Sequence, residues 1–187
     1  MIGTAIVAVL VLAAGVLIAT RRPSFRGVVI SPTAPAAEIN LTDSNGQPFS
    51  LNNQRGKVVL LYFGYTSCPD DCPATMAKLK LTMGLLGNLA QNVQVLMVTT
   101  DPTHDNAAQM KKWMTGFYPT FLGLMGTTDQ LQQAYNAYGV TVEDGGDTHS
   151  TYLYVIDPKG NLRLTFDGPT MEPQDVADDV QTLLKGY

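Results

Sequence analysis

The stretch from Tyr62 to Pro73, with the sequence YFGYTSCPDDCP, constrains the fold more than any other part of the chain. It contains both cysteines of the protein, Cys68 and Cys72, and it follows an apolar run that is typical of a buried strand. Two thiols in one short turn suit a reversible disulfide, or a soft-metal site that takes a third ligand from elsewhere in the chain. The best candidate for that third ligand is His149.

Segments typical of strands and helices alternate along the chain around this turn. We expect a hairpin around Asn45-Gly46, strands over 57–63 and 93–99, helices over 74–90, 105–117 and 128–138, an antiparallel pair over 149–156 and 161–166, and a last helix over 172–184. Pro73 suits the first turn of the helix after the cysteines, and Thr127 or Thr128 suits the N-cap of a later one. This order predicts an α/β domain with a thioredoxin-like fold, a central mixed sheet and an N-terminal hairpin.

The chain is expected to divide into three regions. Residues 1–20 include an uncharged apolar run long enough to cross a bilayer, which favours a single transmembrane anchor over a cleaved signal peptide. Residues 21–37 are rich in proline, serine and alanine and should form a flexible tether, and residues 38–187 should form the folded domain. Arg21 and Arg22 favour a cytoplasmic domain, whereas the chemistry argued below suits the extracytoplasmic side, and this conflict stays open.

Composition excludes several classes of protein. The 187 residues are 45% hydrophobic, which is enough to build a core without disulfides. The net charge of -4 and the lack of any basic stripe argue against a nucleic-acid partner. Two cysteines are also too few for a secreted disulfide scaffold.

The predicted helix after the turn should activate both sulfurs. A helix N-terminus carries unpaired N–H groups and a partial positive charge, and both favour thiolate over thiol. Asp70 and Asp71 oppose this effect on the thiols but attract a cation. Two thiolates and the imidazole of His149 suit Cu(I), or Cu(II) with an added oxygen ligand. Zinc would need a fourth ligand, such as Asp101 or an aspartate of the turn.

Other interpretations of these residues stay open. The two cysteines could form a redox pair without metal, or could simply be buried thiols. A lone histidine on a strand is usually structural, but the glycine-rich loop before His149 would let its ring swing toward the sulfurs. His104 is expected to be solvated, and Asp101 to fix a loop or accept a hydrogen bond near the site. Tyr62 and Tyr65 should pack around the turn and limit water access, and the eight methionines suit core packing.

At these residues the chain resembles the Sco/SenC family of membrane-anchored, copper-binding assembly proteins. The resemblance covers the anchor and the domain from about Ile39 to the last helix. It rests on FGYT before the cysteine motif CPDDCP, then Asp101-Pro102, His149 and Asp157-Pro158-Lys159-Gly160. Two departures leave partner choice and redox tuning open: Ser67 stands where members usually have histidine, and His104 stands near an expected arginine.

The resemblance implies a thioredoxin fold that holds copper through Cys68, Cys72 and His149. It also implies a metallochaperone that delivers copper to the dinuclear copper site of cytochrome c oxidase subunit II, with the domain on the extracytoplasmic side of the membrane. The alternative is a thiol-disulfide oxidoreductase, which would use Cys68 and Cys72 as a redox-active pair on partner cysteines without obligatory metal. A peroxidase is a weaker option, because Thr66 and Ser67 only partly match the activating residues it needs.

Overall fold

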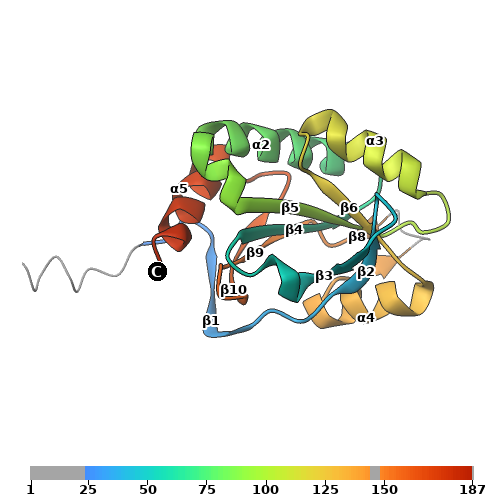
Figure 1. The fold of residues 1–187 in the computed structure, drawn as a ribbon, viewed down its shortest axis with the longest axis horizontal. Coiled ribbons are helices and arrows are strands. Elements are labelled where there is room, and N and C mark those ends of the chain that lie inside the picture. Colours follow the sequence, from blue (N-terminus) through green and yellow to red (C-terminus); the bar gives the residue numbers. More distant parts are fainter. Residues whose placement is uncertain (1–23, 144–147, 187) are drawn as a thin grey trace, which may run out of the picture.

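The computed structural model describes residues 24–143 and 148–186, and these form an eight-stranded sheet with helices on both faces (Figure 1). The strands of this sheet are β1 (Val28–Pro35), β2 (Asn40–Asp43), β3 (Pro48–Ser50), β4 (Val58–Gly64), β5 (Val93–Thr99), β6 (Leu122–Met125), β9 (Tyr152–Ile156) and β10 (Asn161–Asp167). Their order across the sheet is β1-β10-β9-β4-β5-β6-β2-β3. Two further strands, β7 (Val142–Glu143) and β8 (Thr148–His149), form a separate small sheet.

The centre of the large sheet is parallel and its edges are antiparallel. β4 pairs in parallel with β5, and β5 with β6, whereas β9, β10 and β1 continue the sheet on one side in antiparallel pairs. β2 and β3 extend the other side, also antiparallel. Every residue of β4 is buried, because helices cover this strand on both faces.

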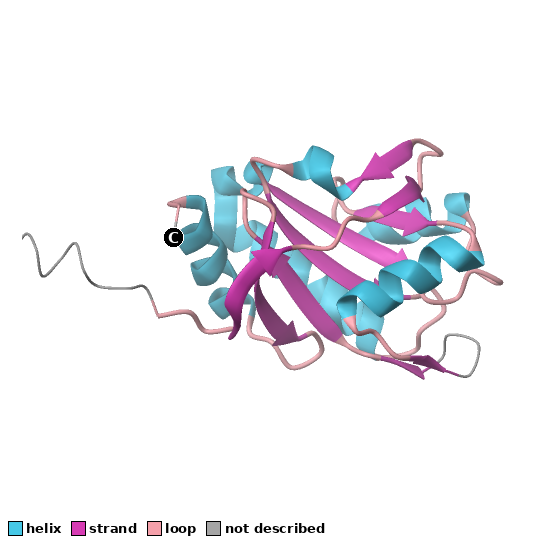
Figure 2. Ribbon diagram, turned by 90° about the horizontal axis from the view of Figure 1, so that it is seen from below, coloured by secondary structure: helices cyan, strands magenta, loops and turns pink. Residues whose placement is uncertain are grey.

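Helices form a layer on each face of the sheet. They are α2 (Asp71–Leu86), α3 (Ala107–Phe117), α4 (Thr128–Tyr138) and α5 (Pro173–Leu184), with short 3-10 helices η1 (Leu51–Gln54) and η2 (Gly87–Asn92). In Figure 1, α2 and α3 lie above the sheet, α5 lies at its left end next to α2, and α4 lies below it; Figure 2 looks onto the lower face. Leu60 and Tyr62 of β4 pack toward the first layer, and Leu61 and Phe63 toward α4.

The α/β, thioredoxin-like fold with a mixed central sheet is confirmed. The Asn45-Gly46 hairpin joins β2 to β3, and the antiparallel pair after His149 is β9 with β10. The helix over 128–138 has the expected bounds, because Thr127 and Gln130 form a reciprocal capping box at its start. The helix after the cysteines begins three residues earlier than expected, at Asp71, and ends before Gly87.

Two strands of the large sheet were not predicted, and neither was β7 of the small one. β6, with the sequence LGLM, adds a third parallel strand beside β5. β1 lies within residues 21–37, so that part of the expected flexible tether is a strand paired with β10. β1 escapes sequence analysis because it is an edge strand with mostly exposed side chains and two prolines, so it shows no alternation of buried and exposed positions.

The predicted strand over 149–156 is also divided in the structure. His149 lies at the end of β8, in the small sheet with β7, and β9 begins only at Tyr152. Between the two strands, the Ser150 N–H donates to the Thr141 carbonyl and the Thr151 carbonyl accepts from Gly168 N–H. The first bond extends the small sheet and the second extends the β9–β10 ladder, so the chain changes sheets between Ser150 and Thr151 and His149 lies in a hairpin beside the large sheet.

The anchor predicted for residues 1–20 lies outside the described part of the chain. Within residues 24–143 and 148–186, none of the helices combines the length and the apolar composition that a bilayer crossing requires.

A buried carboxylate holds the chain where it enters the sheet. Asp179 of α5 is 2% exposed and accepts hydrogen bonds from the backbone N–H groups of Arg26 (2.9 and 3.0 Å) and Gly27 (2.9 Å). Burial raises the pKa of Asp179 above its usual value, and the two backbone donors partly offset this effect. The segment before β1 is thereby fixed to α5.

Replacing Asp179 with alanine should lower the free energy of unfolding by about 1–3 kcal/mol, because the buried Gly27 N–H and the part-buried Arg26 N–H lose their acceptor. Urea unfolding measures this change. The matched control is Asp178→Ala, on the exposed side of the same helix, where the side chain bonds only Gln174 in the described structure. The control should change stability by less than about 0.5 kcal/mol. Equal effects of the two variants would contradict the role assigned to Asp179.

Candidate functional site

The two cysteines lie where β4 gives way to α2. Cys72 is the second residue of α2 and is fully buried, whereas Cys68 lies in the preceding loop and is half-buried. Neither is in a disulfide. The backbone N–H of Cys72 donates to Cys68 Sγ at 3.4 Å. The N–H group in the first turn of α2 therefore points at the Cys68 sulfur.

Cys72 behaves differently from the expectation that both sulfurs favour thiolate. Burial raises the pKa of the Cys72 thiol far above its usual value, and the nearby Cys68 raises it further. A backbone hydrogen bond at Tyr65 offsets only part of this. The prediction of an activated thiolate is therefore wrong for Cys72, because loss of solvent outweighs the helix N-terminus. Loss of this proton therefore needs a compensating interaction, such as a bound cation.

His149 meets Cys72 across 77 positions of sequence. Its Nε2 lies 3.6 Å from Cys72 Sγ, and its Nδ1 lies 3.0 Å from the Ser150 carbonyl oxygen. A carbonyl can only accept, so Nδ1 carries the proton of the neutral ring and Nε2 presents its lone pair to the sulfur. The backbone carbonyl of Ser150, just after β8, thus selects the tautomer that can bind a metal at Nε2.

Two tyrosines pack against the imidazole ring of His149. The rings of Tyr62 and Tyr65 meet it edge to face, with centroids 6.1 and 5.7 Å away. Tyr62 is fully buried and Tyr65 is 5% exposed. Both therefore shield the contact between Cys72 and His149 from water, as expected from their place beside the turn.

Sequence analysis missed the role of Gly64, the last residue of β4. A Cβ atom on this residue would lie 2.8 Å from Cys72 Sγ and 2.8 Å from the Tyr62 ring, which is closer than real contacts allow. The Tyr62 hydroxyl also donates to Cys72 Sγ, at 4.0 Å. A glycine at the end of a buried strand, two residues after a tyrosine and four before a cysteine, is the signal that could have indicated this close packing.

Asp101 and His104 form a pair of their own. Asp101 is buried and accepts from His104 Nδ1 (2.8 Å), the His104 N–H (3.2 Å) and the Thr103 hydroxyl (2.7 Å). Burial alone would raise the pKa of Asp101, but these bonds outweigh it and lower the pKa below the usual value. The His104 side chain is 78% exposed, as expected for a solvated histidine, and Asp101 fixes the loop after β5.

The structure brings the three predicted ligands together through Cys72, which contacts the other two. In the described ranges, no group of three or more His, Cys, Asp and Glu side chains is already arranged to hold a metal ion. The donors still match a soft cation, since two sulfurs and an imidazole lone pair are the ligands that copper prefers. Asp70 and Asp71 are exposed in the same turn.

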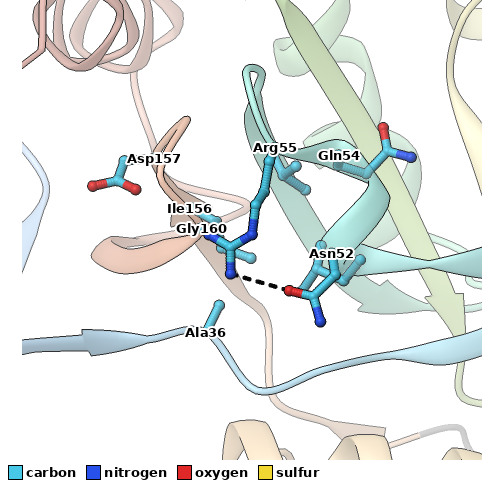
Figure 3. A pocket seen from close by; sticks show the side chains of 9 residues that line it. Ala36, Asn52, Gln54, Arg55, Ile156, Asp157 and Gly160 are labelled. Atoms are coloured by element: carbon cyan, nitrogen blue, oxygen red, sulfur yellow. Dashed lines mark hydrogen bonds between the residues drawn. The ribbon is translucent and has the colours of Figure 1, made fainter.

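A pocket at the other end of β4 has different chemistry (Figure 3). Arg55 reaches over it and donates to Asn52 Oδ1 at 3.1 Å and to the Lys159 carbonyl. Its lining residues are Ala36, Leu51, Asn52, Gln54, Arg55, Val59, Ile156, Asp157 and Gly160. None of these offers a thiol or an imidazole, so the pocket is no candidate for soft-metal binding.

Comparison with known proteins identifies relatives of this chain. The SCO1/SenC family model matches residues 31–185. Protein SCO1, mitochondrial, of Saccharomyces cerevisiae is 36% identical over 133 residues, which are 66% of this chain and 45% of that protein. Protein SCO2, mitochondrial, of the same yeast is 31% identical over 156 residues, 78% of this chain and 52% of that protein. The matched regions span 45% to 66% of the length of the first curated relatives.

Solved structures agree with the fold. Yeast Sco1 with copper bound has a TM-score of 0.70 and 31% identity, and the match covers 82% of this chain and 90% of that one. ScoI of Bradyrhizobium japonicum with copper bound has a TM-score of 0.73 and 28% identity, over 80% of this chain and 99% of that one.

Replacing Gly64 with alanine should push the Cys72 sulfur away from His149 and destabilise the domain by about 1–3 kcal/mol, because the added methyl meets sulfur and ring atoms. Urea unfolding and the rate of thiol alkylation measure the two effects. The matched control is Gly84→Ala in α2, where a Cβ has nothing within 4 Å and should stabilise the helix by about 0.5–1 kcal/mol. A Gly64→Ala protein as stable as the original would show that the packing is loose.

Proposed function

The chain belongs to the SCO1/SenC family, and from this premise we propose that it is a copper metallochaperone. Cys68, Cys72 and His149 capture one copper ion and pass it to the dinuclear copper site of cytochrome c oxidase subunit II, the recipient that the family resemblance implies. The approach of His149 Nε2 to Cys72 Sγ at 3.6 Å carries this proposal. The copper-bound structures of the yeast and B. japonicum relatives support copper as the ion.

The distance between the two donors suits a shared ion. With metal–sulfur and metal–nitrogen bonds of about 2.3 and about 2.0 Å, as in zinc sites, donors 3.6 Å apart subtend an angle of about 115° at the metal. This angle lies between the tetrahedral and trigonal values, so one ion can reach both donors. Cys68 completes the set when its sulfur turns from the Cys72 N–H toward the ion, a rotation open to a half-buried loop side chain.

The different exposure of the ligands supports transfer rather than permanent storage. Cys72 is fully buried, whereas Cys68 and His149 are partly accessible. A partner thiolate can reach the ion from the side of Cys68 and replace that sulfur first. A three-coordinate ion leaves room for such an incoming ligand, which a closed four-ligand structural site would not.

Reduction of partner cysteines is the second candidate function. It is favoured by the accessibility of Cys68, whose sulfur also accepts the N–H of Cys72 at the start of α2. The Cys68 thiolate would attack a partner disulfide and release one partner thiol. Cys72, losing its proton, would then attack the mixed disulfide, which leaves a Cys68–Cys72 disulfide and a fully reduced partner. This reaction needs both cysteines but not His149.

We also propose that the apolar run within residues 1–20 attaches the domain to a membrane, with the copper site on the extracytoplasmic side. The support for this is the length and lack of charge of that run. Arg21, Arg22 and Arg26 still argue for the opposite orientation.

Replacing the ligands one at a time separates the two functions. The reduced full chain should bind about one Cu(I), and Cys68→Ala or His149→Ala should lower the affinity at least about tenfold. A chromophoric Cu(I) chelator measures the affinity by competition. His104→Ala is the matched control, because this second histidine is exposed and bonded to Asp101. Unchanged copper affinity in Cys68→Ala would exclude the metallochaperone, and redox cycling that survives in His149→Ala would favour the oxidoreductase.

Copper binding should weaken as the pH falls. Because burial raises the pKa of Cys72, this thiol keeps its proton near neutral pH, and Cu(I) must displace it. Acidification favours the protonated, metal-free form, so the apparent affinity should fall about tenfold or more for each pH unit. Competition titrations between about pH 6 and about pH 8, corrected for protonation of the chelator, measure this slope. A flat profile would mean that Cys72 is not a thiolate ligand.

A further inference from the structure

We infer that Asp105 is a positioning residue for the cysteine turn. It fixes Thr66 by hydrogen bonds, and Thr66 in turn sets the position of the Cys68 sulfur. The inference deepens the proposed function and rests on it for the copper readout. Asp105 lies between β5 and α3, and it is 39 positions away from Thr66 in sequence. It is only 8% exposed, so its charge must be satisfied by protein groups.

Both carboxylate oxygens of Asp105 are engaged. Oδ1 accepts from the Thr66 backbone N–H at 3.2 Å and from the Thr66 hydroxyl at 2.5 Å. Oδ2 accepts from the Thr99 hydroxyl at 2.6 Å. One side chain therefore joins the loop after β4 to the last residue of β5. The backbone of Asp105 is itself fixed, because its N–H donates to the Asp101 carbonyl at 3.0 Å.

The surrounding bonds all point toward this carboxylate. Gln109 Nε2 donates to the Thr66 hydroxyl oxygen at 2.6 Å, so the Thr66 hydroxyl proton is free to go to Asp105. In the same way the Asp101 N–H donates to the Thr99 hydroxyl oxygen at 3.1 Å, and the Thr99 proton goes to Asp105. A one-way chain of donors polarises each hydroxyl and strengthens the final bonds. It needs at its end a group that accepts three hydrogen bonds and donates none.

This network determines where Cys68 lies. Thr66 is two residues before Cys68 and two residues after the end of β4. Because Asp105 accepts from both the N–H and the hydroxyl of Thr66, this residue has a fixed position at the start of the turn that leads to α2. A shift of the turn would move Cys68 Sγ away from the Cys72 N–H, which it accepts at 3.4 Å, and from the ion shared with His149. Small displacements of this kind strongly change the binding of a metal.

The chain offers a matched control in Asp157. This carboxylate is 3% exposed and accepts from the backbone N–H groups of Lys159 (2.9 Å) and Asn161 (2.9 Å) and from Arg163 Nη1 (3.1 Å). It organises the turn between β9 and β10, beside the start of β4 and at the opposite end of that strand from the cysteines. Its loss should cost stability without moving the turn at Cys68.

The experiment compares Asp105→Ala with Asp157→Ala in the full chain. Both variants should unfold more easily in urea, because each leaves buried donors without an acceptor. Only Asp105→Ala should lower the Cu(I) affinity, by about 10- to 100-fold. Asp105→Asn should restore it to within about threefold, because the amide oxygen can still accept from the Thr66 N–H and hydroxyl, which position the turn, and only the bond from the Thr99 hydroxyl is lost. Wild-type affinity in Asp105→Ala, or an equal loss in Asp157→Ala, would overturn the inference.

A second readout keeps this test separate from the proposed function. The ratio of dithiol to disulfide at Cys68 and Cys72 in a glutathione buffer needs no copper, and Asp105→Ala should change it by more than about threefold while Asp157→Ala does not. If the wild-type chain binds no copper, the metallochaperone proposal fails, and the glutathione ratio alone decides on Asp105. If Asp105→Ala does not fold, Thr66→Val takes its place: it removes the hydroxyl bond at similar size and should shift the ratio in the same direction. No shift in that variant would overturn the inference.

Discussion

The complete burial of β4 is the constraint on which the rest of the structure depends. Helices on both faces leave no residue of Val58–Gly64 exposed, so the chain must pass from the middle of the core into α2 within six residues. This short passage places Cys72 against Gly64, where only a hydrogen fits beside the sulfur. It also leaves Cys68 in the loop, half in solvent. The asymmetry between the two thiols therefore follows from the way in which the central strand ends.

Elements with strong local signals could be predicted from the sequence, and those defined by distant partners could not. β5 and α4 have the expected bounds because one is a continuous apolar run and the other has a capping box at Thr127. β1 is held by its pairing with β10 and by Asp179, more than 120 residues away in sequence, and its own side chains are mostly exposed. No local pattern contains that information. The division of the 149–156 strand has the same origin, since Thr141 and Gly168 take up the intervening backbone groups.

The candidate site shows the same limit at the level of side chains. Cys68, Cys72 and His149 could be selected because thiols and imidazoles in turns are chemically specific, and the structure places His149 against Cys72. Their assignment as ligands remains a prediction. Asp105 could not be selected, because an aspartate gains its role here only from the distant groups that donate to it, and Gly64 offered only its position at the end of a buried strand. The prediction of a thiolate at Cys72 was wrong for a related reason. The sequence around the cysteines indicated where the helix starts, but it did not indicate how deeply Cys72 is buried.

In the proposed function, the different burial of the two thiols determines the order in which the copper ligands are exchanged. Cys72 and His149 face each other in a site that Tyr62 and Tyr65 shield, so water and partner ligands have little access to that half of the ion. Cys68 is accessible, and its sulfur accepts the Cys72 N–H when it is not bound to the ion. Breaking the bond to Cys68 therefore leaves a sulfur that still has a partner, whereas breaking the bond to Cys72 would leave a buried anion without one. Exchange should begin at Cys68, and Cys72 should release the ion only as its proton returns.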